Sequence, residues 1–221
     1  MIQPDARSRL TATDLALVCE GMTGHRPSET DLDLWLLDID LDQVLDAPET
    51  AARLRRCPMP GPSPSLLFYV LVRGALLRRD LADRPLADYC ATMLREFGAG
   101  DRAHRVAPVD DHRHLYLVDI LQDAATAEGD RRLQVLAHLG NYALWFAGMF
   151  PDRIASRQRR AGGPDLGYYD AMGSQGFAEA AEHRTAARLG LDGLYRSASL
   201  AYPLLRAAFN EVSGSLHLRA A

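Results

Sequence analysis

The fold is decided by the stretch LGNYALWFAGMFPDR, residues 139–153. Apolar residues occur on nearly every side of a helix drawn through it, and such a helix belongs at the centre of a protein. Pro151 ends this helix, because proline lacks the N–H that the next turn requires. Asn141 and Tyr142 are its polar members, and buried polar groups need hydrogen-bond partners. The sequence therefore predicts a central helix over about residues 130–148.

Helical signals recur on both sides of this segment. Thr11 and Ser28 each precede an aspartate by three residues, as helix N-caps do, and Pro48 fits the first turn of another helix. Pro203 is expected to kink the last helix. Hairpin dipeptides and series of alternating segments are absent from the sequence. We therefore expect an all-α fold, a single globular bundle of about eight to ten helices with no substantial sheet. Further helices are expected at about residues 65–79, 85–97, 112–127, 165–189 and 192–216.

Charge and proline content divide the chain. Residues 1–50 contain 11 acidic side chains and 3 arginines, a local balance of −8 within a total of −4. Alternate prolines at 58–64 remove backbone donors and favour extended structure. We expect an acidic N-terminal helical segment at 1–57 packed on the body, a Pro-rich strap at 58–64, and a main helical domain at 65–221. The acidic face disfavours contact with nucleic acid.

Composition excludes several chemistries. All 25 basic residues are arginine, so a Walker-type phosphate-binding lysine and Schiff-base chemistry are absent. Cys19, Cys57 and Cys90 form no CxxC motif, which favours a reducing compartment over a disulfide framework. The N-terminus lacks the apolar core of a signal peptide, and the longest apolar run, residues 66–72, is too short to span a bilayer. We therefore expect a cytoplasmic protein.

An aspartate-rich run over residues 38–49 allows two interpretations. Counted from Asp38, five acidic residues occupy ligand positions of a twelve-residue EF-hand calcium loop. However, Gln43 stands where such a loop needs glycine, and Pro48 opposes its exiting helix. The favoured alternative is one helix or a pair of short helices, with an apolar stripe beside an acidic one. That apolar stripe consists of Leu34, Leu37, Leu41, Val44 and Leu45.

The densest histidine group is His112 and His114, with His104 upstream. In an extended loop these imidazoles suit zinc or iron, whereas on a helix residues two apart point away from each other. We expect the helical alternative, with Asp111 as N-cap, and favour no metal site. The Glu-x-x-His pairs of helical di-iron proteins are absent from the sequence, and buried aspartates here are expected to pair with arginine. The weak metal candidates are Asp119, Asp123, His138 and His183.

Small residues interrupt the helix that follows Gly162-Gly163-Pro164. Gly173, Ser174 and Gly176 cost helix stability and are tolerated where another helix or a ligand approaches the backbone closely. Tight packing against the central helix is the favoured interpretation. The alternative is a ligand pocket between the helices at 136–150 and 165–190. Its candidate lining residues are Asn141, Tyr142, Trp145, Tyr168, Tyr169 and Ser174.

The sequence contains no complete catalytic constellation. Ser174 lies in Met-Gly-Ser-Gln-Gly, one glycine short of a nucleophile elbow and without a preceding strand. Cys57 follows two arginines that favour a thiolate, but no histidine is near it in sequence. We therefore assign no catalytic residue and expect no cofactor. Guanidinium groups hold phosphate or carboxylate, which makes a run of arginines a candidate anion site. Its residues are Arg153, Arg157 and Arg160.

The stretches at 139–153 and 168–177 resemble signatures of an uncharacterised family of bacterial all-helical proteins. The resemblance covers mainly residues 64–98 and 136–210. It implies a helical bacterial protein and brings no activity, cofactor or site residue with it.

Two functions remain. The favoured one is a protein-interaction or regulatory module without catalysis, which binds a protein partner or forms a homodimer through the acidic N-terminal face or an exposed end of the Trp145–Phe150 region. The alternative is a ligand-binding protein or a metal-dependent oxygenase-like enzyme that uses the pocket between helices 136–150 and 165–190. Nucleic acid is not expected as a partner, because the arginine run has no interleaved aromatic residues. A membrane is not expected either, because the longest apolar run is too short to span a bilayer.

Overall fold

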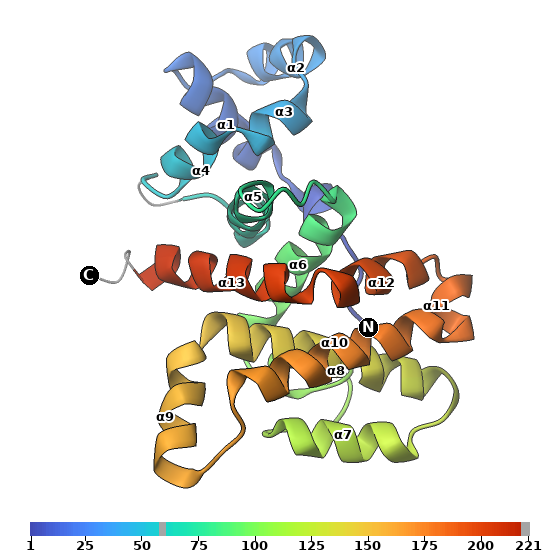
Figure 1. Ribbon diagram of the computed structural model, residues 1–221. Coiled ribbons are helices and arrows are strands. Elements are labelled where there is room, and N and C mark those ends of the chain that lie inside the picture. The colour runs from blue at the N-terminus through green and yellow to red at the C-terminus, as the bar shows by residue number, and fades with distance from the viewer. Residues whose placement is uncertain (58–60, 218–221) are drawn as a thin grey trace. The chain divides into compact units, whose positions relative to one another are not determined.

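The all-α prediction is confirmed by the computed structural model, which describes residues 1–57 and 61–217. The chain is 74% helical, and these described residues contain no strand and 11 helices of seven or more residues (Figure 1). None of the described helices has both the length and the apolar character needed to cross a membrane. In the predicted Pro-rich strap, residues 58–60 lie outside the described part of the chain, and 61–63 are irregular.

The chain forms two compact units. The N-terminal unit is Ile2–Arg95, and the C-terminal unit contains the residues from Glu96 onward together with Met1. The sequence had placed the boundary at the Pro-rich strap. The division lies instead near the end of a later helix, so that residues 65–95 belong with the acidic segment.

In the N-terminal unit, local caps begin the first helices. The Thr11 hydroxyl accepts a hydrogen bond from the Asp14 N–H, and the Asp14 carboxylate accepts one from the Thr11 N–H. Ser28 and Asp31 form the same reciprocal box, so both predicted N-caps are confirmed. The elements are η1 (Arg7–Arg9), α1 (Ala12–Thr23), α2 (Glu29–Asp38), α3 (Leu41–Asp46), α4 (Pro48–Leu54), α5 (Pro64–Leu77) and α6 (Arg84–Phe97).

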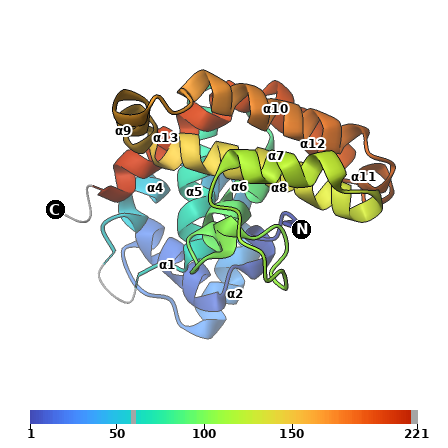
Figure 2. The ribbon, with the colours of Figure 1, turned by 90° about the horizontal axis from the view of Figure 1, so that it is seen from below.

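In the C-terminal unit, α8 is the central helix, as predicted. Its residues from Val135 to Leu144 are all buried, and it packs against α7, α10 and α13. Figure 2 shows α7, α8 and α10 running beside one another. The elements are η2 (Arg102–His104), α7 (Leu117–Thr126), α8 (Gly129–Met149), α9 (Pro151–Ala161), α10 (Leu166–Glu182), α11 (Arg184–Arg188), α12 (Asp192–Leu200) and α13 (Tyr202–His217).

Glycines bring α8 and α10 into close contact. A Cβ atom added at Gly176 would lie 3.0 Å from the backbone nitrogen of Gly140. One added at Gly140 would lie 2.7 Å from two carbons of the Phe177 ring, and one added at Gly173 would overlap the Tyr202 ring. Only a residue without a side chain allows this approach. The expected packing against the central helix is confirmed for Gly176, whereas Gly173 packs against Tyr202 of α13.

Two long helices expected at the C-terminus are each divided. The first breaks at His183, whose extended backbone ends α10 and whose ring accepts a hydrogen bond from the Thr185 N–H, which begins α11. The second breaks at Ala201, where only a kink was expected from Pro203. Proline cannot donate to the Ser199 carbonyl four residues earlier, and that carbonyl accepts from the Ser174 hydroxyl at 3.1 Å.

Candidate functional site

Arginines hold two carboxylates of the aspartate-rich run. Arg73 Nε donates to Asp46 Oδ1 at 2.8 Å, while its Nη2 donates to Asp46 Oδ2 at 2.9 Å. Arg84 Nη2 donates to the same Oδ2 atom at 2.9 Å, and Arg7 pairs with Asp42. Hydrogen bonding from Arg73 is the main cause that lowers the pKa of Asp46. These carboxylates therefore join α3 to α5, α6 and η1.

The remaining part of the run forms a helix cap. Asp40 Oδ1 accepts from the backbone N–H groups of Asp42 and Gln43 at 3.0 and 3.3 Å, which begins α3. The chain is extended at Ile39, where α2 ends. The prediction of a pair of short helices is confirmed. Of the carboxylates that a calcium loop would need, Asp40 is used in this cap, and Asp42 and Asp46 are used in ion pairs with arginine.

The apolar stripe expected to run through both short helices was wrong, because the extended residue Ile39 breaks its register. Val44 and Leu45 in α3 are buried. In α2 the inward-facing residue is Leu32, which packs with Ala16 and Cys19 of α1. The half-buried residues Trp35 and Leu36 complete this small apolar cluster.

Two leucines of α2 face outward. Leu34 is 57% exposed and Leu37 is 81% exposed. At 3.6 residues per turn they lie about 60° apart around the helix axis, and both lie roughly 140–160° from Leu32. The helix is therefore apolar on two opposite sides, of which its own unit buries one.

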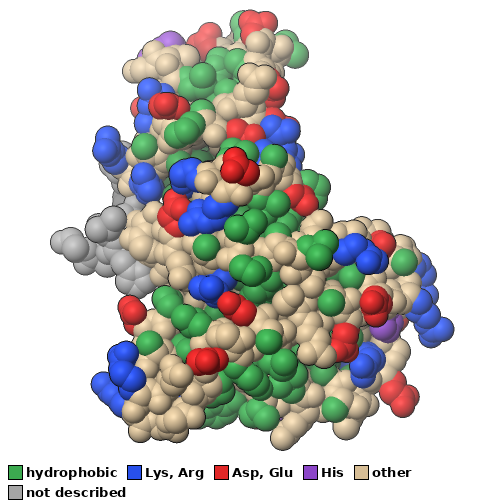
Figure 3. Space-filling view, viewed as in Figure 1, with side chains coloured by type: hydrophobic (Ala, Val, Ile, Leu, Met, Phe, Trp, Pro, Cys, Tyr) green, Lys and Arg blue, Asp and Glu red, His purple; other side chains and the backbone are tan. Residues whose placement is uncertain are grey.

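Aspartates border the two exposed leucines. Asp33 lies about 40° from Leu37 on the helix, and Asp38 lies about 40° from Leu34 on the other side, with Asp31 beside it. Asp31 accepts a hydrogen bond from the Ser28 hydroxyl at 2.7 Å. Asp33 and Asp38 are exposed and have no ion pair within the described residues. We call Leu34 and Leu37 with these three aspartates the outer face of α2. Figure 3 shows acidic and apolar side chains, with some basic ones, on the surface of the N-terminal unit.

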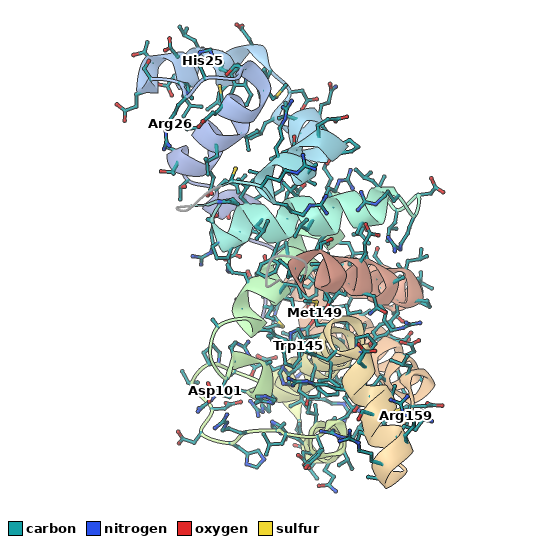
Figure 4. All side chains as sticks on the ribbon, turned by 90° about the vertical axis from the view of Figure 1, so that its left-hand side faces the viewer. His25, Arg26, Asp101, Trp145, Met149 and Arg159 are labelled. Carbon is teal, nitrogen blue, oxygen red and sulfur yellow. The ribbon has the colours of Figure 1, made fainter. Side chains whose placement is uncertain are left out.

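Of the residues proposed to line a ligand pocket, three join an aromatic cluster. Tyr142 lies 6.0 Å from Trp145 between ring centroids, and Phe146 lies 5.9 Å from Tyr142 and 5.7 Å from Tyr169. The Tyr142 hydroxyl donates to the Leu115 carbonyl at 3.0 Å, and burial raises its pKa to about 12. Trp145 and Met149 lie one turn apart on α8 (Figure 4).

Of the other proposed pocket residues, Tyr168 borders this cluster and Ser174 lies elsewhere. Asn141 is buried in α8, and Tyr168 packs edge-on against Tyr169 with centroids 6.1 Å apart. Ser174 faces Ser199 of α12, where the two hydroxyls are 3.2 Å apart. A groove of about 210 Å³ does lie between α7, α8 and α10, and the six proposed residues are not among those that line it. It is lined by Leu121, Ala124, Ala125, Arg132, Leu136, Leu139, Met172, Gln175 and Glu179.

The histidine segment is extended, and the helix expected from His112 begins only at Leu117. The predicted N-cap at Asp111 is wrong: Tyr116 holds that position, and its backbone N–H donates to the Asp119 carboxylate in the first turn of α7 at 3.0 Å. The backbone N–H of His114 donates to the backbone carbonyl of His104 at 2.7 Å, and this hydrogen bond keeps the segment extended. As a result, the rings of His112 and His114 are 4.8 Å apart instead of pointing away from each other.

Buried histidines adjoin this segment. His114 and His138 are both buried, with ring centroids 6.4 Å apart, and burial lowers the pKa of each. His114 Nε2 lies 3.4 Å from Asp123 Oδ2, which also accepts from Arg131 at 3.2 Å. His114, Asp123 and Arg131 line part of an open cleft of about 680 Å³.

The metal candidates are not assembled into one site. Asp119 caps α7, Asp123 pairs with Arg131, and His183 caps α11. Within residues 1–57 and 61–217, no group of three or more histidine, cysteine, aspartate or glutamate side chains is arranged to hold a metal ion. The expected pairing of a partly buried aspartate with arginine is confirmed for Asp123, which pairs with Arg131.

The candidate anion-binding arginines lie along α9 and are exposed. The Arg157 guanidinium lies over the rings of Tyr116 and Phe146, 5.4 and 5.8 Å from their centroids. Arg153 lies 4.9 Å from the centroid of the Phe150 ring. The Arg153 and Arg157 side chains therefore lie over aromatic rings, whereas Arg160 lies in the last turn of α9.

The comparisons with known proteins identify no relative: no protein-family model, curated protein or solved structure matches the chain. The outer face of α2 was missed by sequence reasoning, which assigned its leucines to a single stripe with α3. The signal was nevertheless present, because Leu32, Trp35 and Leu36 form their own stripe at helical spacing and leave Leu34 and Leu37 on the opposite side.

Proposed function

We propose that the chain is a cytoplasmic protein-interaction module without catalysis and that it binds a protein partner through the outer face of α2. The observation that carries this proposal is the exposure of Leu34 and Leu37 on a helix whose opposite side is already buried. Each buried leucine contributes about 1.5–3 kcal/mol, so covering this face favours association.

The arrangement of these leucines distinguishes them from scattered surface residues. Single exposed apolar side chains are normal, and Leu200, 81% exposed, is one example. Leu34 and Leu37 instead lie side by side between acidic residues, which is the pattern of a small apolar centre with a polar rim. Three free cysteines support the cytoplasmic part of the proposal.

The absence of catalysis is supported by the way polar groups are used. A general base needs an accessible nitrogen or oxygen atom within reach of a substrate. His138 lies in the interior beside Phe97 and Tyr142, and Asp123 is engaged by Arg131. The groove between α7, α8 and α10 is about 210 Å³, below the roughly 300–1,000 Å³ of ordinary small-molecule sites, which disfavours a ligand pocket between these helices.

The test compares three immobilised proteins in extracts of the source cells. These are the wild type, a Leu34→Ser/Leu37→Ser variant, and Leu200→Ser as a control that changes a leucine of the same exposure as Leu37. Proteins retained by the wild type are identified, purified and titrated against all three. Circular dichroism checks that each variant keeps its helical content.

We expect at least one purified partner to bind the wild type and Leu200→Ser equally. Its affinity for the double variant should be lower by about tenfold or more, because two apolar contacts are lost. The proposal is wrong if every purified candidate binds the double variant as tightly as the wild type.

A further inference from the structure

We infer that the partner segment that covers the outer face of α2 is a basic amphipathic helix. This inference rests on the proposed function and specifies the chemistry of the partner. Its basis is the arrangement of charge around Leu34 and Leu37, which is fixed by the positions of residues on a regular helix.

The leucines and aspartates of α2 follow the spacing of a helix-pairing surface. In such pairs, two apolar positions three or four residues apart face the partner, and the positions immediately beside them carry the charges that select it. Leu34 and Leu37 have this apolar spacing. Asp33 lies on one side of them, and Asp31 and Asp38 lie on the other. Both flanks of the apolar centre are therefore negative.

The surrounding arginines leave this charge uncompensated. Residues 1–50 contain 3 arginines, of which Arg7 pairs with Asp42 and Arg9 with Asp5. The third, Arg26, lies with His25 in the connection between α1 and α2 (Figure 4). Asp33 and Asp38 have no ion pair within the described residues, so their carboxylates are available to a partner.

Charge excludes a second copy of α2 as the occupant. Two such faces placed together would bring aspartates opposite aspartates on both flanks, which disfavours pairing. A helix with apolar residues at one side and arginine or lysine at the flanking positions satisfies the leucines and the aspartates together. Because the 10 residues of α2 extend about 15 Å, a matching helix needs roughly three turns.

The probe is a synthetic helical peptide of about three heptads with leucine at the a and d positions and arginine at e and g. Mutual repulsion of its arginines keeps it from pairing with itself. The same peptide with glutamate in place of arginine is the charge control. Binding to the full-length protein is measured by fluorescence anisotropy of the labelled peptide, in low salt and in high salt.

We expect the arginine peptide to bind the wild type with Kd on the order of 0.1 mM, and Leu200→Ser equally. Leu34→Ser/Leu37→Ser should abolish saturable binding. Asp33→Asn/Asp38→Asn, which leaves both leucines in place, should weaken it roughly fivefold and reduce its dependence on salt. The glutamate peptide should not bind.

Three results would overturn the inference: no saturable binding of the arginine peptide to the wild type, equal binding to Leu34→Ser/Leu37→Ser, or equal binding of the glutamate peptide. The natural partner separates the two proposals. A partner lost by Leu34→Ser/Leu37→Ser but unaffected by Asp33→Asn/Asp38→Asn overturns the basic helix and leaves the interaction module in place. A partner unaffected by either double variant overturns both.

Discussion

Replacing Gly140 with alanine should destabilise the protein, although alanine is the better helix former. Removing glycine from a helix interior gains about 1 kcal/mol. The new Cβ atom, however, would lie 2.7 Å from the Phe177 ring. That ring is fully buried, with the rings of Tyr195 and Tyr202 at 6.1 and 6.2 Å between centroids. Because Phe177 has little room to move, we take the upper end of the overpacking range, about 3 kcal/mol.

The net loss is therefore about 2 kcal/mol, which lowers Tm by roughly 4–8 °C in a chain of this size. Calorimetry or urea unfolding measures it. Gly214→Ala is the matched control, since a Cβ there meets nothing within 4 Å, and it should stabilise the protein by up to about 1 kcal/mol. In a Phe177→Leu background, Gly140→Ala should cost less. The reasoning is refuted if Gly140→Ala raises Tm as Gly214→Ala does.

Three further predictions concern charged and reactive groups. Asp46→Asn should cost about 3 kcal/mol in urea unfolding, because it leaves buried Arg73 without its carboxylate; a loss below 1 kcal/mol would contradict this. Burial lowers the pKa of His138, so below about pH 6.5 the unfolded chain binds a proton that the native protein does not, and stability falls as the pH falls. His138→Leu should therefore lose less stability than the wild type between pH 7 and pH 5, and equal losses would count against this. In the native protein only Cys57, the one cysteine that is not buried, should react rapidly with a thiol reagent; three rapid equivalents would disprove it.

The central helix and the N-caps were predictable because they depend on neighbours in sequence. The apolar residues of 139–153 surround a helix axis whatever packs on them. Thr11 and Ser28 each meet an aspartate within one turn. Pro203 indicated an interruption of the last helix. The sequence does not show that the Ser199 carbonyl, which the proline leaves without its helical donor, accepts from Ser174 of another helix.

The extended histidine segment was not predictable from local pattern. Asp111 is an acceptable N-cap in the sequence, but the helix begins later, at Leu117, because the backbone of His114 pairs with that of His104. That pairing joins residues ten apart, and helical periodicity carries no information on it.

The candidate site was missed for a related reason. Leu34 and Leu37 fit two stripes equally well, one shared with Val44 and Leu45 and one opposite Leu32. The extended backbone at Ile39 decides between them, because it ends α2 before the first stripe can continue. The side of α2 that is buried thus depends on where the helix ends. The pattern of leucines and aspartates does not predict that position.

The central claim is that the outer face of α2 is the surface that a partner covers. Hydrogen exchange of the full-length protein, with and without a saturating purified partner, tests it most directly. We expect slowed exchange to concentrate in α2, from Glu29 to Asp38, and to be lost with Leu34→Ser/Leu37→Ser. Slowed exchange in α9 or in the 104–116 segment, with α2 unchanged, would contradict it.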